Sequence, residues 1–146
     1  MTLAPLEPAS AAFEAFEQAL TSAGLPTSDL LAEGGRYYVL RCPDGHDVAY
    51  AGLTPLGDEA LLRSVVVPAA SRGRGFGADV VARLGGLAST YHVRRLWLLT
   101  TDAEAFFAGL GFVAVDRGQA PAPVTATRQV SDLCPQSAVL MCRTLA

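Results

Sequence analysis

A chain of 146 residues with 51% hydrophobic content is long enough for one domain with a real core, and we expect no second domain. The formal net charge is -3 and all 11 basic residues are arginines, a composition that argues against nucleic-acid binding. The three cysteines lack Cys-x-x-Cys spacing and there are only two histidines, which argues against a zinc site. No signal peptide or long apolar run is recognised, so we expect a cytoplasmic protein without membrane contact.

The first half of the chain predicts a strand, a helix and a hairpin. Residues 3–7 are expected to form a short strand, and Ser10 is a predicted N-cap for a helix that ends near Gly24. Residues 37–41 and 48–53 are rich in β-formers and flank a Pro-Asp-Gly turn, which predicts an antiparallel hairpin.

The second half predicts a buried strand followed by further alternating elements. Residues 61–67 are almost continuously apolar, as in a central strand, and residues 75–91 carry apolar side chains at helical spacing. The apolar face of that helix is predicted to comprise Phe76, Val80, Leu84, Leu87 and Tyr91. The later expected elements are a strand at 95–100, a helix at 103–110 and strands at 112–116 and 138–145, with residues 124–135 left unassigned.

The turn between the buried strand and the long helix has the sequence RGRGFG at residues 72–77. The first N–H groups of a helix are unpaired and electropositive, and glycines let an anion approach them, so a pyrophosphate would fit here, although such turns also serve plain chain reversal. A Walker-type loop is excluded because the chain has no lysine. A dinucleotide fingerprint through Gly73, Gly75 and Ala78 fits poorly, because the turn lies mid-chain after a hairpin.

The same motif, with the order of elements around it, resembles the GNAT-type N-acetyltransferases over nearly the whole chain. The resemblance implies one α/β domain over residues 1–146, with a mixed sheet of six to seven strands that is splayed between the fourth and fifth strands and has helices on both faces. It also implies acetyl-CoA as co-substrate. The coenzyme-binding residues implied are Val65, Val66, Val67, Arg72, Gly73, Arg74, Gly75, Phe76, Gly77, Thr100 and Phe107.

The catalytic half departs from the family pattern, because Phe107 stands where many members have a tyrosine acid. We expect Phe106 to turn into the core and Phe107 to lie beside the coenzyme sulfur. The proton on the leaving thiolate then comes from water or another tyrosine, or the thiolate leaves unassisted, so the catalytic residues stay unassigned. The candidate acids are Tyr38, Tyr50 and Tyr91, and the candidate bases are Glu59, His46 and Asp102.

Arg63 lies inside the apolar strand, where an arginine is seldom buried without an anionic partner. One interpretation is a structural ion pair with Asp58, Glu59 or Asp116, or escape of the side chain to solvent. The other is an anchor for an acid group of the acceptor substrate. The residues expected to help in that second role are Arg36, Tyr37, Tyr38, Arg117 and Arg128.

A narrower resemblance to the arsenic-resistance-associated N-acetyltransferases rests on short motifs at residues 61–64, 98–101 and 133–138. It implies a small-molecule amine acceptor, such as an amino-acid antibiotic bearing an arsinate or phosphinate. Cys134, within the last motif, is interpreted as a core residue, a ligand or a reactive thiol. The alternative function is an acyl-CoA-binding regulatory module without turnover, and a homodimer is left open.

Overall fold

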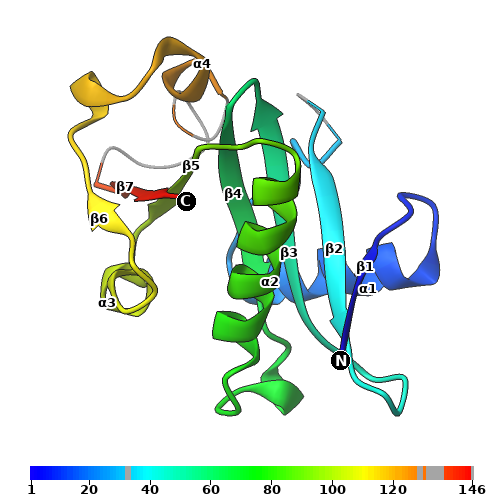
Figure 1. The fold of residues 1–146 in the computed structure, drawn as a ribbon. Coiled ribbons are helices and arrows are strands. Elements are labelled where there is room, and N and C mark those ends of the chain that lie inside the picture. The colour runs from blue at the N-terminus through cyan, green and yellow to red at the C-terminus, as the bar shows by residue number, and fades with distance from the viewer. Residues whose placement is uncertain (32–33, 128–129, 131–136, 146) are drawn as a thin grey trace.

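The computed structural model describes residues 1–31, 34–127, 130 and 137–145 (Figure 1). Its seven strands form one mixed sheet in the order β1-β2-β3-β4-β5-β7-β6. The strands are β1 (Thr2–Pro5), β2 (Arg36–Arg41), β3 (Asp47–Leu56), β4 (Glu59–Val66), β5 (Arg95–Thr100), β6 (Val113–Ala114) and β7 (Val139–Thr144). The helices are α1 (Ala11–Ser22), α2 (Phe76–Thr90), α3 (Glu104–Ala108) and α4 (Ala122–Thr125), with 3-10 turns at Ala69–Ser71 and Arg117–Gln119.

The α1 helix begins where the sequence predicts it. The Ser10 hydroxyl accepts a hydrogen bond from the Phe13 N–H at 3.1 Å and so satisfies one of the donors left open in the first turn. Phe13, Phe16 and Leu20 lie on the buried face, and their rings and methyls pack against β2 and β3. The hairpin of β2 and β3 is antiparallel as predicted.

Helices cover both faces of the sheet, as predicted (Figure 1). Alternate residues of a strand point to opposite faces, so adjacent residues of β2 join different cores. Val39 packs under α1, whereas Leu40 packs on the other face with Val80 and Leu84 of α2. Val124 of α4 packs over Trp97 of β5 on the α1 side of the sheet.

The sheet opens between β4 and β5. These two strands are parallel, and they pair only at Glu59 with Arg95, Ala60 with Leu96 and Leu61 with Trp97. Beyond Leu61 the strands separate, whereas β5 and β7 stay paired along their whole lengths. The predicted splay is therefore present, and it leaves the ends of both strands available to line a site.

Some predicted boundaries and faces were wrong. The α2 helix ends at Thr90, so Tyr91 is its C-cap and is 62% exposed instead of belonging to the apolar face. The predicted strand at 112–116 shortens to Val113–Ala114. The short α4 helix was not predicted, and it ends inside the segment at 124–135 that carried no assignment. No helix among the residues described combines the length and the apolar content needed to cross a membrane.

Candidate active site

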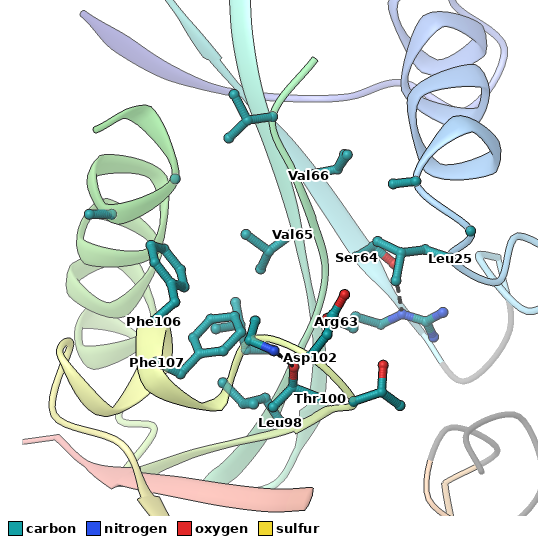
Figure 2. A pocket seen from close by; sticks show the side chains of 18 of the residues that line it. Leu25, Arg63, Ser64, Val65, Val66, Leu98, Thr100, Asp102, Phe106 and Phe107 are labelled. Carbon is teal, nitrogen blue, oxygen red and sulfur yellow. Dashed lines mark hydrogen bonds between the residues drawn. The ribbon is translucent and has the colours of Figure 1, made fainter. Parts of the chain in front are cut away.

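A pocket of about 830 Å³ lies where β4 and β5 diverge. Its walls come from the segment after α1, the second half of β4, the loop before α2, the end of β5, and α3. Figure 2 shows Ser64 and Leu25 on one side of the pocket and the two phenylalanines of α3 on the other. The pocket therefore draws on segments that are far apart in the sequence and meet only because the sheet is splayed.

The loop before α2 forms one end of the pocket. Gly73 and Gly75 adopt left-handed backbone angles, with φ of 81° and 79°, which favour glycine over residues with a Cβ. Gly75 is also the N-cap of α2 and supplies no side chain to the open N–H groups of the first turn. These donors and the positive end of the helix dipole suit a pyrophosphate.

The two arginines of this loop differ in position. Arg72 lines the pocket, and its Nε donates a hydrogen bond to the carbonyl oxygen of Val67 at 3.0 Å, so it ties the loop to the end of β4. Arg74 is exposed and does not line the pocket. Of the predicted coenzyme residues, all except Arg74 are brought together around the pocket.

Gly77 allows α3 to pack closely on the start of α2. A Cβ at this position would lie 3.3 Å from the ring of Phe106, closer than most side-chain contacts, and 3.5 Å from Cγ2 of Val67, an ordinary contact distance. The glycine therefore permits the close contact between the loop and the aromatic wall of the pocket.

The expected orientation of Phe106 was wrong. Phe106 is 42% exposed, whereas Phe107 is 7% exposed and packs edge-on against both Phe106 and Phe112. The α3 helix is only five residues long, so contact with Phe112 in the core fixes its phase. Phe106 and Phe107 both line the pocket and make its α3 side apolar.

The β4 strand is distorted at Ser64. Tyr50 of β3 pairs with Val66 and Gly52 pairs with Arg63, so Ala51 alone faces both Ser64 and Val65. Ser64 has φ of 57°, a left-handed conformation that costs a residue other than glycine about 1 kcal/mol or more. Its side chain lines the pocket. Nothing in the sequence pattern indicates this bulge, because serine is an ordinary strand residue.

Arg63 forms a buried ion pair. Its Nη1 and Nη2 atoms donate to the two carboxylate oxygens of Asp29 at 2.7 and 2.5 Å, and the two side chains are 1% and 0% exposed. The ion-pair interpretation is thus confirmed, but none of the three predicted partners was correct. Asp29 lies 34 residues away in a segment without periodic pattern, so the sequence offered no signal for it.

The candidate tyrosine acids lie away from the pocket. Tyr50 packs against Phe16 under α1, and Tyr38 lies on the α2 side of the sheet. Burial raises the pKa of both hydroxyls, which keeps them protonated. Tyr91 is exposed at the far end of α2. No tyrosine is among the described residues that line the pocket.

The candidate bases separate clearly in space. Glu59 lies at the closed end of β4, the end that is paired with β5, where it forms an ion pair with Arg95 and accepts a hydrogen bond from Trp97 Nε1 at 3.3 Å. His46 is exposed in the hairpin turn beside Asp44. Neither lines the pocket. Asp102 does, and it is the only carboxylate among the described lining residues. Next to it, the Thr100 hydroxyl accepts a hydrogen bond from the Ala103 N–H at 3.0 Å and holds the turn into α3.

The other predicted acceptor residues are not brought to the pocket. Arg36 is exposed on β2, and Tyr37 is buried beneath α1 with its ring beside Gly52. Arg117 donates to the carbonyl oxygens of Val130 and Ala138 at 3.0 and 3.2 Å, and so links Val130 to the residue just before β7. The positions of Arg128 and Cys134 lie outside the described residues.

A family model described as the Acetyltransferase (GNAT) family matches residues 6–112, which include β4, the glycine loop, α2 and α3. The chain belongs to the GNAT acetyltransferase family. This GNAT protein is therefore an acyltransferase whose co-substrate is acetyl-CoA. The search of curated proteins found no match.

Solved structures share the fold over the whole chain. A Mycobacterium tuberculosis protein in complex with CoA and NLQ is 21% identical, with a TM-score of 0.80 and coverage of 100% of both chains. An acetyltransferase of the GNAT family from Staphylococcus aureus is 17% identical, with a TM-score of 0.76 and coverage of 99% of this chain and 100% of that one. N-acetylglutamate synthase from Neisseria gonorrhoeae, complexed with coenzyme A and N-acetyl-glutamate, is 17% identical, with a TM-score of 0.78. The match covers 100% of this chain and 36% of that one.

Proposed function

We propose that this GNAT protein is an N-acetyltransferase that moves an acetyl group from acetyl-CoA to the amine of a small molecule. The observation that carries the proposal is one continuous pocket with two unlike ends. One end has the glycine loop and the start of α2, which suit a pyrophosphate. The other end has Ser64, Thr101 and Asp102, which suit a polar acceptor.

In the proposed reaction, the acceptor amine attacks the thioester carbonyl carbon, the new C–N bond forms, and the C–S bond breaks to release the thiolate. The amine must first lose a proton, and in this proposal Asp102, which lines the pocket, takes it directly or through a water. The backbone of Val65, Val66 and Val67 would hold the pantetheine arm along the open edge of β4. As the amide forms, the nitrogen gives up a second proton to water, and water delivers a proton to the thiolate, so that CoA leaves as the free thiol. Placing the two reactants together supplies much of the rate.

The finer proposal is that the acceptor is an amino acid or an amino-acid-like oxyanion, including arsinate or phosphinate antibiotics. Arg63 supports it, because this residue is among those that line the pocket. Each terminal guanidinium nitrogen carries two N–H groups, and the Asp29 oxygens accept one from each. Because the Arg63 side chain is almost fully buried, the hydrogen bond to an acceptor oxyanion would come from the neighbouring Ser64 hydroxyl, which lines the pocket.

A panel assay tests both levels of the proposal. Purified protein is incubated with acetyl-CoA and single acceptors, and free thiol is followed with time. The panel pairs amino acids with their decarboxylated amines and includes a phosphinate and an arsinate amino acid. We expect thiol release that depends on an acceptor and is faster for the member of each pair that carries the acid group.

The outcomes separate the alternatives. Equal rates within each pair would refute the oxyanion acceptor but leave the N-acetyltransferase in place. Tight acetyl-CoA binding without thiol release for any acceptor would instead favour a regulatory module. This alternative is motivated by the lack of a tyrosine among the described residues that line the pocket.

A further inference from the structure

The buried ion pair and the strained serine are neighbours on the wall of the pocket. Arg63 directly precedes Ser64, and its Nε lies 3.4 Å from the Ser64 Oγ as a long hydrogen bond (Figure 2). Because Nε donates to this oxygen, the hydroxyl's own hydrogen is available to a ligand in the pocket. Asp29, Arg63 and Ser64 thus form a chain of contacts that ends at the pocket surface.

An ion pair with both side chains almost fully buried is expensive to form. Removing two charges from water costs several kcal/mol per ion, and apolar residues of similar size often stabilise a fold as well or better. Stability alone is therefore a weak reason for this pair. Its place suggests another reason, because it lies at the point where β4 leaves β5 and takes up the left-handed angle of Ser64.

The pair also joins two walls of the pocket. Leu25 and Pro26 line the pocket on the segment that leads to Asp29, and Ser64 and Val65 line it on β4. The guanidinium lies over the ring of Tyr37 at 5.9 Å from its centre, which further restricts where Arg63 can sit. The two charged side chains therefore set the distance between the loop after α1 and the bulge of β4.

We propose that Asp29 and Arg63 are positioning residues that hold the Ser64 bulge, and that the Ser64 hydroxyl donates a hydrogen bond to the acceptor. The inference rests on the proposed N-acetyltransferase function and assigns three residues of its acceptor wall. Asp29 acts on the acceptor through Arg63 and Ser64. The pair is not required for the coenzyme, whose proposed contacts on β4 begin at Val65.

A second buried charged contact on the same strand provides a matched control. Glu59 is also on β4 and faces the same side of the sheet as Arg63, because the two positions differ by an even number of residues. Its contacts with Arg95 and Trp97 lie where β4 and β5 are regularly paired, outside the pocket. Loss of Glu59 should therefore cost stability alone.

Four variants test the proposal: Asp29→Asn, the double variant Asp29→Leu/Arg63→Met, Ser64→Gly and Glu59→Gln. We expect Tm to fall by roughly 10 °C in Asp29→Asn, because a buried cation loses its counter-charge, and to recover largely in the neutral double variant. Ser64→Gly suits the left-handed backbone and removes the short hydroxymethyl side chain, so Tm should hold.

The kinetic readout separates positioning from stability. We expect the acceptor kcat/KM to fall by about tenfold or more in both the double variant and Ser64→Gly, with the acetyl-CoA Kd unchanged. Adding Ser64→Gly to the double variant should cause no further loss, since the pair acts through the hydroxyl. Glu59→Gln should lower Tm and leave kcat/KM unaltered.

Wild-type acceptor kinetics in the stable double variant would overturn the positioning role, and wild-type kinetics in Ser64→Gly would overturn the role of the hydroxyl. The assay uses an acceptor identified in the panel. Failure of the proposed function itself would show as wild-type protein that binds acetyl-CoA and acetylates no acceptor, a result distinct from either.

Discussion

Phe107 is buried beside the pocket and cannot exchange a proton, so the chemistry must work around an apolar ring. Phe106 and Phe112 hold the Phe107 ring in edge-to-face contacts, with ring centroids 5.0 and 5.8 Å from its own. None of the three tyrosines proposed as substitutes lines the pocket. Departure of the thiolate with protonation by water is therefore the simplest mechanism consistent with these positions.

Phe107→Tyr tests whether protonation of the thiolate limits turnover. A general acid contributes about 10²–10⁴-fold when proton transfer is limiting, but a hydroxyl added to this buried ring also needs a hydrogen-bond partner. We expect kcat to change by less than about tenfold. Steady-state thiol release is measured for Phe107→Tyr and for Phe106→Tyr, the neighbouring ring, as control. A hundredfold gain confined to Phe107→Tyr, or a large loss in a Tyr→Phe variant at position 38, 50 or 91, would contradict this mechanism.

At the scale of elements, the sequence predicted what local patterns encode. The Ser10 cap and the aromatic spacing of α1 specify a helix on their own, and the apolar run of β4 specifies a buried strand. The RGRGFG turn predicted the glycine loop that lines the pocket, because glycine adopts positive φ more readily than other residues.

The pocket wall with Arg63 and Ser64 and the orientation of α3 could not be predicted in this way, because both depend on tertiary contacts. Asp29 meets Arg63 only when the segment after α1 folds across β4. The Ser64 bulge exists because β3 and β4 are out of step by one residue, which no propensity of serine indicates. The phase of α3 follows from the core contact of Phe107, since a helix this short has too few residues to show a periodic pattern.

The loop and the first turn of α2 should act as one coenzyme-binding element. A Cβ at Gly75 would meet no atom within 4 Å in the free protein, so Gly75→Val adds bulk to open space that the pyrophosphate would occupy. We expect the Kd for acetyl-CoA, measured by calorimetry, to rise by at least about tenfold in a folded variant.

Gly45→Val is the matched control for backbone strain. Gly45 also has positive φ, at 92°, and also has open space around its Cβ position, but it lies in the hairpin turn away from the pocket. Both variants should lose comparable stability, because valine resists a left-handed backbone. Only Gly75→Val should lose coenzyme affinity, and equal affinities in the two variants would contradict the assignment of the loop.

The molecule as a whole consists of two half-sheets with a narrow connection. Strands β1 to β4 form one half and β5, β7 and β6 form the other, and three residue pairs near the closed end of β4 join them. The pocket takes lining residues from both halves, with Val65 to Val67 and the glycine loop on one side and Thr100 and Phe107 on the other. A coenzyme in this pocket would therefore contact both halves at their open ends.

Acetyl-CoA should consequently stabilise both half-sheets together. At a concentration of about 100 times Kd, a ligand that binds only the folded state adds about 2.7 kcal/mol, which corresponds to a rise in Tm of roughly 5–10 °C for a domain of this size. Thermal scans with and without acetyl-CoA measure the shift, and Gly75→Val at the same acetyl-CoA concentration should show a clearly smaller one. Hydrogen exchange then shows which segments acetyl-CoA stabilises. Amides at both the end of β4 and the end of β5 should exchange more slowly in the complex. Slower exchange confined to the glycine loop would contradict a coenzyme that bridges the gap.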